Sequence, residues 1–313
     1  MAVDVSIIII NYNTADYTIN CIESIIKHTS KNITCQYLIV DNGSEAENYF
    51  NLKEYIDSLS KTITIKLIRS NINTGFGGGN MIGAKYAKGK YLAFINNDVL
   101  LKNDCLSILK IFMDTNKNVG VCGPQAFKEN KEILPTLDHF ASLGRELFGR
   151  KVLESVNPKK YPKRKQFYSS PKKGQFVAGS FMFFSSADFN KIGGFDTNIF
   201  LYYEETDICK RLEKINKEAF LVPEGHFIHF HGASTPKQVA LKIELKISLL
   251  YVIRKHYGLV SFYILLRYLQ LKYFISSLIK PKNWPVFIAL LKQAPLSISL
   301  KHKQSINPLP DAI

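Results

Sequence analysis

Short apolar runs that stop abruptly at asparagine or aspartate constrain the fold of this chain more than any other feature. Three runs and the polar residues after them are 5–10 before Asn11, 37–40 before Asp41, and 91–95 before Asn96, Asn97 and Asp98. Nearly continuous apolar runs of this length are typical of parallel strands buried on both faces. The carboxyl ends of parallel strands lie along one edge of a sheet, where open α/β folds bind ligands. We therefore expect these polar side chains to line a single crevice.

The segments between the runs have the periodicity of helices. Apolar residues recur at helical spacing over 16–28, and a further strand is predicted over 63–68. Strands that alternate with helices indicate an α/β fold with a parallel sheet of the nucleotide-binding kind. The same patterns predict a helix over 103–115 and strands over 119–122 and 176–184.

The charge of the chain is concentrated in two segments. The 313 residues carry a net charge of +15, yet 150–173 holds nine Lys and Arg against one acidic residue, and 237–303 holds twelve against one. A hydrophobic content of 46% and a charged content of 21% are typical of a globular protein. The basic segments are therefore attachments to a nearly neutral catalytic part. The most basic stretch, 159–165, is either a solvated loop or a contact for phosphate or anionic lipid.

The cysteines and the amino terminus favour a cytoplasmic protein. The five cysteines form no CxxC pair and fall in segments predicted to be buried or helical. This pattern favours a reduced chain without structural zinc. The sequence runs from Met1 into the first strand without the basic and apolar segments of an export signal.

Two of the polar strand ends offer specific chemistry. The amides and carboxylate of Asn96, Asn97 and Asp98 are hard oxygen ligands, which suit Mg²⁺ or Mn²⁺ holding a diphosphate better than zinc. The alternative is an Asx-rich turn before the next helix. Asp41 can accept hydrogen bonds from a nucleobase or ribose, or it can cap a helix.

Small residues mark two further places of close approach. Gly75 begins a glycine cluster that leads into a predicted helix, where backbone can approach an anionic ligand. The cluster lacks the lysine of a P-loop and follows the third strand, so a dinucleotide fingerprint fits poorly. Gly179 and Ser180 interrupt a bulky predicted strand, which indicates close approach by a ligand or by another backbone segment.

A second acidic cluster and two histidines follow. Glu204, Glu205 and Asp207 fall in the first turn of a predicted helix, where the helix dipole accounts for one or two acids. Asp207 and Arg211 have i,i+4 spacing and can pair, which leaves Glu204 or Glu205 free as a general base. His229 and His231 lie on one side of an extended segment and are candidates for a metal or diphosphate contact.

Taken together, these motifs resemble family 2 glycosyltransferases with the GT-A fold, and within that family the bacterial rhamnosyltransferases of polysaccharide assembly. The resemblance covers about residues 3–257. It implies an α/β GT-A nucleotide-sugar-binding domain with a mostly parallel central sheet over 1–236. The basic amphipathic helical extension would then cover 237–313.

The resemblance also implies an activity and roles for the site residues. The enzyme would be an inverting, metal-dependent transferase that moves a sugar, first of all L-rhamnose from dTDP-rhamnose, to a lipid-linked cell-surface polysaccharide. Glu205 would be the base, with Glu204 as the alternative; Asp98 would be the metal ligand of a degenerate DxD motif; and His229 or His231 would close on the Mg²⁺ or Mn²⁺ or on the diphosphate. Donor contacts would come from Asn11, Asn13, Asp41, Asn71, Gly75, Asn80, Asn96 and Asn97, and acceptor contacts from Gly179, Ser180, Asp207 and Arg211.

Alternative functions remain at this point. Asn96 replaces the first aspartate of DxD, which permits an inert glycosyltransferase-like scaffold, and a UDP-hexose donor is also open. A nucleic-acid-binding protein would explain the charge but not the acidic and amide residues at strand ends, so no nucleic-acid partner is expected.

The carboxyl-terminal segment predicts where the protein works. Residues 248–279 are rich in apolar side chains, but the longest uncharged stretch, 258–266, is far shorter than the ~20 residues of a transmembrane helix. Basic amphipathic helices of this kind bind anionic membrane surfaces, here the inner face of the plasma membrane. The alternative is packing on the catalytic domain or on a second subunit in a homodimer.

Overall fold

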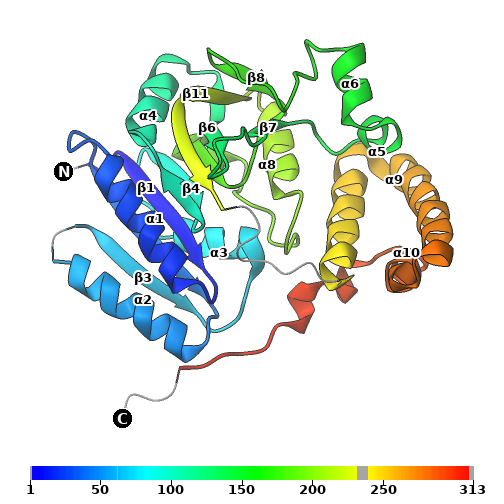
Figure 1. Ribbon diagram of the computed structural model, residues 1–313, viewed down its shortest axis with the longest axis horizontal. Coiled ribbons are helices and arrows are strands. Elements are labelled where there is room, and N and C mark those ends of the chain that lie inside the picture. Colours follow the sequence, from blue (N-terminus) through cyan, green and yellow to red (C-terminus); the bar gives the residue numbers. More distant parts are fainter. Residues whose placement is uncertain (1, 62, 231–238, 310–313) are drawn as a thin grey trace.

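A mixed α/β sheet forms the centre of the computed structural model, which describes residues 2–61, 63–230 and 239–309 (Figure 1). The parallel half is ordered β3-β2-β1-β4 and comprises β1 (Val5–Asn11), β2 (Cys35–Asn42), β3 (Ile65–Ser70) and β4 (Tyr91–Asn96). The sheet continues through β10 (Phe181–Ser185), β6 (Val119–Phe127), β11 (Glu218–His229) and β5 (Val99–Leu101), with β8 (Lys172–Gly174) also paired to β11. β10 is antiparallel to both β4 and β6, so the sheet is mixed beyond the parallel half.

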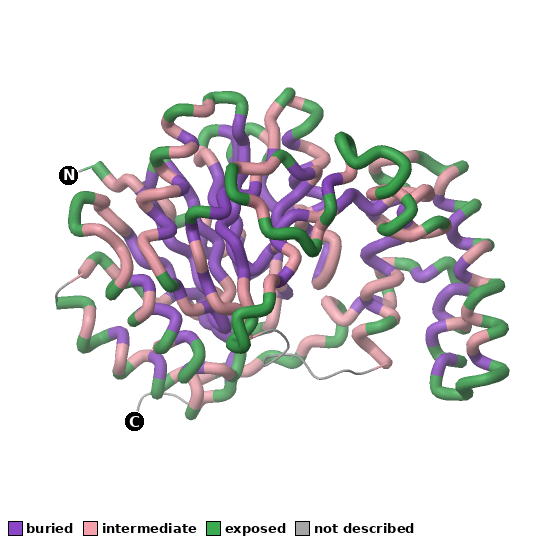
Figure 2. The backbone as a smooth tube through the Cα atoms, turned by 45° about the horizontal axis from the view of Figure 1, so that its top comes forward, coloured by how far each residue is buried: buried purple, intermediate pink, exposed green. Residues whose placement is uncertain are grey.

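Apolar residues bury both faces of this sheet. Alternate residues of β1 point to opposite faces, so that Ile7 and Ile9 pack in one core and Ile8 packs in the other. The first core is covered by α1 (Ala15–His28), α2 (Ala46–Leu59) and α4 (Cys105–Thr115), and the second by α3 (Gly75–Ala84), α7 (Ser186–Lys191) and α8 (Glu204–Glu213). Figure 2 shows the buried strands at the centre of the molecule. The expected α/β architecture is confirmed.

The structure corrects the boundaries of one expected strand. The strand predicted over 176–184 is divided into β9 (Phe176–Val177) and β10, with a turn at Gly179 and Ser180 between them. β9 pairs with β7 (Leu137–Asp138) in a small separate sheet, because its direction changes at this turn. Between β7 and β8 lie two short helices, α5 (Leu143–Phe148) and α6 (Arg150–Val156).

The carboxyl-terminal part is helical, as expected. Helix α9 (Val239–Ile279) bends at Gly258, whose φ of 80° and ψ of −177° break the helix into two arms. Figure 1 shows the arms side by side, with α10 (Trp284–Leu291) beside them. Their facing apolar side chains, including Ile253, Phe262 and Leu290, form a core of their own. The predicted domain boundary between residues 236 and 237 lies outside the described residues.

Helix α9 has the length and composition of a helix that could cross a membrane. It is the single helix in the described chain that is long and apolar enough by length and composition, and 39% of its most apolar window is buried inside the protein. The bend at Gly258 and the shared core show that both arms are part of the folded molecule.

The 3₁₀ turn η1 (Pro281–Asn283) precedes α10. After α10, the 3₁₀ turns η2 (Leu296–Ile298) and η3 (Leu300–Lys303) lie in a chain that returns toward the sheet. In Figure 1 this red segment runs back from α10 toward α2 and β3.

Candidate active site

The polar strand ends meet at one edge of the sheet, as the sequence predicted. In the strand register, Asn11 lies opposite Asp41, Asp41 lies opposite Arg69, and Ile10 lies opposite Asn96. The carboxyl ends of β3, β2, β1 and β4 therefore form a continuous row of polar residues. Of the candidate donor contacts, Asn11, Asp41 and Asn96 are neighbours along this row.

Asp41 is the centre of a buried hydrogen-bond network at one end of the row. Its Oδ2 accepts from Asn11 Nδ2 (2.9 Å), and its Oδ1 accepts from the backbone N–H of Ser44 (3.2 Å) and pairs with Arg69. Thr18 Oγ1 donates to Asn11 Oδ1 (2.9 Å). The Arg69 guanidinium also lies over the ring of Tyr49, at 4.9 Å from its centroid. Sequence reasoning missed Arg69, although an arginine at the end of an apolar strand beside an aspartate strand end was a usable signal.

The other predicted donor contacts differ in exposure and in hydrogen bonding. Asn13 adopts a left-handed φ of 55°, and its Oδ1 accepts from the backbone N–H of Glu45 (2.8 Å). Asn71 is exposed after β3. Asn80 is buried, and its Nδ2 has no hydrogen-bond partner among the described residues, so a donor atom is left for a ligand.

Gly75 lies against the backbone of another segment of the chain. It adopts a φ of +76°, and a Cβ at this position would lie 2.2 Å from the backbone oxygen of Phe200. The close approach that requires glycine is therefore made by the segment around Phe200, whose oxygen also accepts from the N–H of Phe76 (3.0 Å). Phe200 therefore explains the need for glycine here, and a donor contact at Gly75 stays a prediction.

The Asn96–Asp98 step divides its side chains between structure and chemistry. Asn97 Nδ2 donates to Thr14 Oγ1 (2.7 Å) and Thr18 Oγ1 (3.0 Å), so this amide holds the start of α1. The backbone N–H of Asn96 donates to the oxygen of Ser180 (2.9 Å), which brings the β9–β10 turn to the same edge. Asp98 is nearly buried at the end of the step.

Asp98 and His229 are brought together, as predicted for the metal site. His229 Nε2 lies 3.2 Å from Asp98 Oδ1. The backbone N–H of Phe230 donates to the backbone oxygen of Asp98 (3.0 Å). A cavity of about 70 Å³ opens beside Asp98 and is lined by Tyr17, Asn97 and Phe230 among others. His231 lies outside the described residues.

These two side chains fit a hard divalent ion that a substrate also ligates. The described residues contain no group of three His, Cys, Asp or Glu side chains that could hold a metal by themselves. Mg²⁺ commonly binds to one or two protein carboxylates together with substrate phosphates and water. Asp98, just after β4, supplies such a carboxylate, and the imidazole of His229 at the end of β11 lies beside it.

Glu205 projects into the edge formed by the β9–β10 turn. The backbone N–H of Gly179 donates to Glu205 Oε1 (3.0 Å). A Cβ on residue 179 would lie 2.5 Å from this oxygen, so the bond requires glycine. Burial raises the pKa of Glu205 above its usual value, which suits a carboxylate that must take a proton near neutral pH.

Glu204 has a different environment on the same helix turn. Its side chain is buried, and its Oε1 has no hydrogen-bond partner within the described part of the chain. Burial, reinforced by the nearby Glu205 carboxylate, raises the pKa of Glu204 well above its usual value. Glu205 is partly exposed and is held by the Gly179 N–H, whereas Glu204 is buried, so Glu205 is the more accessible of the two carboxyl groups.

Asp207 and Arg211 pair with each other, as their spacing predicted. Arg211 donates from Nε (2.9 Å) and Nη2 (2.7 Å) to Asp207 Oδ2, while Oδ1 contacts His256 Nε2 (2.8 Å) and Lys255 Nζ (2.6 Å) of α9. Burial alone would raise the pKa of Asp207, but His256, Arg211 and Lys255 outweigh it and hold this pKa well below its usual range. We assign this buried carboxylate to anchoring α9 rather than to the acceptor.

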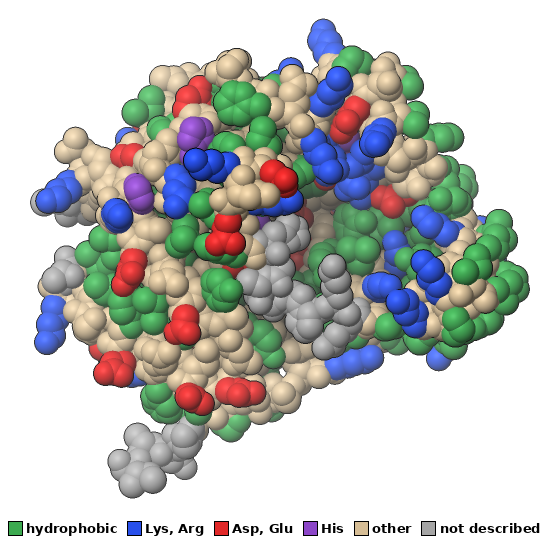
Figure 3. All heavy atoms as spheres, viewed as in Figure 1, with side chains coloured by type: hydrophobic (Ala, Val, Ile, Leu, Met, Phe, Trp, Pro, Cys, Tyr) green, Lys and Arg blue, Asp and Glu red, His purple; other side chains and the backbone are tan. Residues whose placement is uncertain are grey.

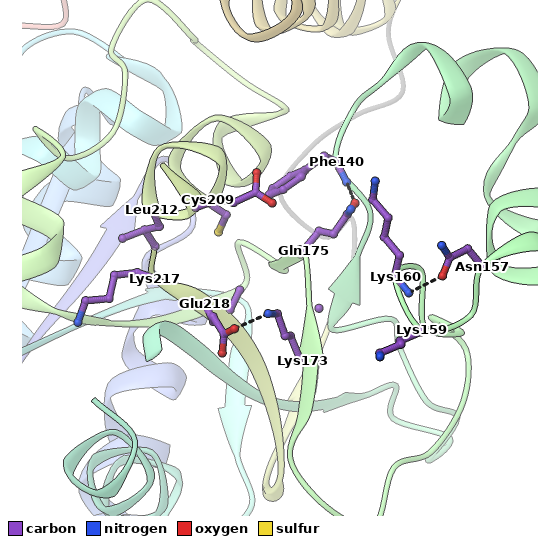
Figure 4. Close-up of a pocket in the computed structure, with 13 residues that line it drawn as sticks. Phe140, Asn157, Lys159, Lys160, Lys173, Gln175, Cys209, Leu212, Lys217 and Glu218 are labelled. Atoms are coloured by element: carbon purple, nitrogen blue, oxygen red, sulfur yellow. Dashed lines mark hydrogen bonds and ion pairs between the residues drawn. The ribbon is translucent and has the colours of Figure 1, made fainter. Parts of the chain in front are cut away.

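A larger cavity than the one beside Asp98 lies elsewhere in the described structure. A cleft of about 620 Å³ lies between α8, β8 and the segment after α6 (Figure 4). Lys159 and Lys160 of the basic stretch line this cleft. Lys173 of β8 also lines it and forms an ion pair with Glu218. A phosphate contact for the basic stretch stays a prediction.

Comparison with known proteins identifies the family. A family model described as Glycosyl transferase family 2 matches residues 6–193. The chain belongs to this family. Among curated relatives, this glycosyltransferase is 28% identical to the rhamnosyltransferase WbbL of Escherichia coli strain K12 over 58% of this chain and 71% of WbbL. It is 22% identical to the dTDP-rhamnosyl transferase RfbF of Shigella flexneri over 83% of this chain and 79% of RfbF.

Solved structures show the same fold. The mannosyltransferase PcManGT from Pyrobaculum calidifontis, solved with GDP-Man and Mn²⁺, superposes with a TM-score of 0.56 at 14% identity over 95% of this chain and 87% of that one. GalNAc-T7, solved with UDP, GalNAc and Mn²⁺, gives a TM-score of 0.60 at 16% identity over 81% of this chain. This chain spans only 48% of GalNAc-T7. The GT-A architecture is thereby confirmed.

Proposed function

We propose that this glycosyltransferase is an inverting, metal-dependent enzyme that transfers L-rhamnose from dTDP-rhamnose to a lipid-linked polysaccharide acceptor. The observation that carries the proposal is the meeting of Asp98, His229 and the Gly179–Glu205 contact at one edge of the sheet. The rhamnosyltransferase names of two relatives support the choice of sugar. A UDP-hexose donor is the alternative within the same chemistry.

Each end of the row has a part in the proposed reaction. The network around Asp41 and Asn11 would hold the nucleoside of the donor. Mg²⁺ or Mn²⁺ held by Asp98 and His229 would supply positive charge for the departing diphosphate.

Glu205 would then act on the acceptor. The Gly179 N–H holds Oε1, which would leave Oε2 to accept the proton of an acceptor hydroxyl. As Glu205 takes the hydroxyl proton, the acceptor oxygen bonds to the anomeric carbon from the face opposite the diphosphate, and the bond to the diphosphate oxygen breaks. A single displacement inverts the anomeric centre, so no second carboxylate is needed as a nucleophile.

Thermal stabilisation tests the donor. Unfolding is followed with dTDP, UDP and GDP and with their common sugar conjugates, each with Mn²⁺, Mg²⁺ or EDTA. A ligand at about 100 times its dissociation constant stabilises the folded state by about 2.7 kcal/mol, which is readily measured. A metal-dependent shift with dTDP and turnover of dTDP-rhamnose support the proposal. Nucleotide binding without turnover of any sugar conjugate would indicate the inert scaffold.

The arm of α9 that follows Gly258 supports membrane attachment. Val260, Ile264, Leu271, Ile275 and Leu278 are exposed at helical spacing, on the side opposite the buried Phe262, Leu265 and Leu269. Figure 3 shows apolar and basic side chains together on the side formed by α9 and α10. Glu244 is the single acid within 237–303, and it is buried. An apolar face with basic neighbours fits an anionic lipid surface.

Vesicle flotation tests this attachment and separates it from dimerisation. Phosphatidylglycerol vesicles should float the protein, and Leu271→Glu with Ile275→Glu should abolish flotation. Ile111→Glu, an equally conspicuous change of an exposed residue on α4, should leave it intact. If no vesicle binds and the double variant instead converts a dimer to a monomer in sedimentation, the face is a subunit interface.

A further inference from the structure

The chain returns to the donor end of the sheet after its helical extension. The return begins at the buried Glu244 of α9, which accepts from Ser299 Oγ (2.7 Å) and from the backbone N–H of Leu300 (2.8 Å). Residues 304–309 then run without regular structure, and Ile306 is 71% exposed. We call residues 304–309 the tail segment.

Asn307 fastens the tail segment to the ends of both β2 and β3. Its backbone N–H donates to the oxygen of Asn71 (2.7 Å), and its Nδ2 donates to the oxygen of Gly43 (2.8 Å). Its own backbone oxygen accepts from Arg69 Nη2 (2.7 Å). Asn307 therefore anchors an otherwise exposed segment, and all three of its hydrogen bonds reach the sheet edge that carries Asp41.

Arg69 connects this anchorage to Asp41. Its Nη1 pairs with Asp41 Oδ1, and its Nη2 is shared between the oxygens of Ser44 (2.9 Å) and Asn307. Its Nε is buried and has no partner among the residues described. The guanidinium is therefore oriented by contacts from two separate segments, the end of β2 with the residues after it and the tail segment.

We infer that the tail segment is a wall of the donor's nucleobase site and that Asn307 is a positioning residue for Arg69 and Asp41. The inference rests on the proposed function, because it assumes that a nucleoside is bound at Asp41. A base that approaches Asp41 meets the loops after β2 and β3, which Asn307 ties together through Gly43 and Asn71. Loss of the tie should weaken recognition of the base and leave the diphosphate end unchanged.

The test compares a ligand that has a base with one that lacks it. Affinities for dTDP, UDP, GDP and inorganic pyrophosphate are measured with Mn²⁺ by calorimetry. Asn307→Ala removes the bond to Gly43 and should weaken the best nucleotide by about threefold to tenfold, the usual net effect of one hydrogen bond. A chain that ends at Gln304 removes all three bonds and should lose more. Pyrophosphate affinity should stay within about twofold in both variants.

Asn130→Ala is the matched control: it also removes one hydrogen bond of an asparagine side chain, here from the backbone N–H of Glu132 (3.1 Å) in the exposed loop after β6, and it should leave nucleotide affinity unchanged. In turnover assays, Asn307→Ala should raise the donor KM with little change in kcat. The inference is overturned if nucleotide affinity is unchanged, if it increases, or if pyrophosphate affinity falls to the same extent. If the unaltered protein binds pyrophosphate but none of the nucleotides, the proposed function fails together with this role.

Discussion

Replacing Gly179 with alanine should reduce catalysis much more than stability. The added Cβ would lie 2.5 Å from Glu205 Oε1, and ordinary contact begins at 3.4 Å. Glu205 must therefore retreat by about 0.9 Å, because the turn at Gly179 is held by the Asn96 to Ser180 hydrogen bond. The 3.0 Å bond between Gly179 N–H and Oε1 is then lost.

The expected magnitudes follow from this displacement. A misplacement of about 1 Å at a reacting group can cost about 100-fold in rate. The stability loss should be near 1 kcal/mol, the usual net worth of one hydrogen bond, because the end of the Glu205 side chain can move. The φ of Gly179 is not in the left-handed region, so alanine adds no backbone strain there.

The assay measures kcat with saturating donor and acceptor, alongside the midpoint of urea unfolding. Gly144→Ala is the matched control, because a Cβ there would meet only Leu153 Cδ2 at 3.7 Å. Gly179→Ala should lose about 100-fold in kcat, and Gly144→Ala should lose none. Full activity in Gly179→Ala would refute the assignment of Glu205 as a base held by this turn.

Three further outcomes are expected. Glu205→Gln should lower kcat by about 10²-fold to 10⁴-fold, the usual contribution of a general base, whereas Glu204→Gln should keep most of the activity; the reverse pattern in the same assay would assign Glu204. Asp98→Ala should abolish the Mn²⁺-dependent part of thermal stabilisation by dTDP without unfolding the chain; an unchanged shift would place the metal elsewhere. Because the pKa of Asp207 is held below its usual range, its stabilisation is present above the ordinary aspartate pKa and is lost as pH falls through the lowered value; in urea titrations Asp207→Asn should flatten this acid dependence, and an unchanged dependence would contradict the anchoring by His256.

The sequence predicted the row of polar strand ends because that signal is local. An apolar run followed by a polar residue marks the end of a buried strand, and parallel strands place such ends together. The meeting of Asp98 with His229 was implied by the family resemblance, which left His229 and His231 as alternatives. Gly75 shows the limit of such local signals. A glycine indicates that another group comes close, but its sequence context does not show that this neighbour is Phe200.

Contacts between distant segments could not be predicted in this way. Arg69 and Asn307 are separated by 238 positions, and no periodicity of either segment indicates that they meet. Likewise, nothing near Asp207 in the sequence shows that His256 of α9 will contact it. These contacts depend on how the helical extension packs, which becomes visible only in three dimensions.

Helix α8 connects the proposed base to the helical extension. Glu205 and Asp207 are two residues apart, which turns them by about 200° around the helix and so to nearly opposite sides. Glu205 meets the β9–β10 turn at the sheet edge, and Asp207 meets Lys255 and His256 in the first arm of α9. One turn of helix therefore fixes the distance between the proposed base and the helical extension. If the second arm of α9 lies on a membrane, as we propose, the same turn sets the height of Glu205 above the lipid surface, where a lipid-linked acceptor would present its hydroxyl.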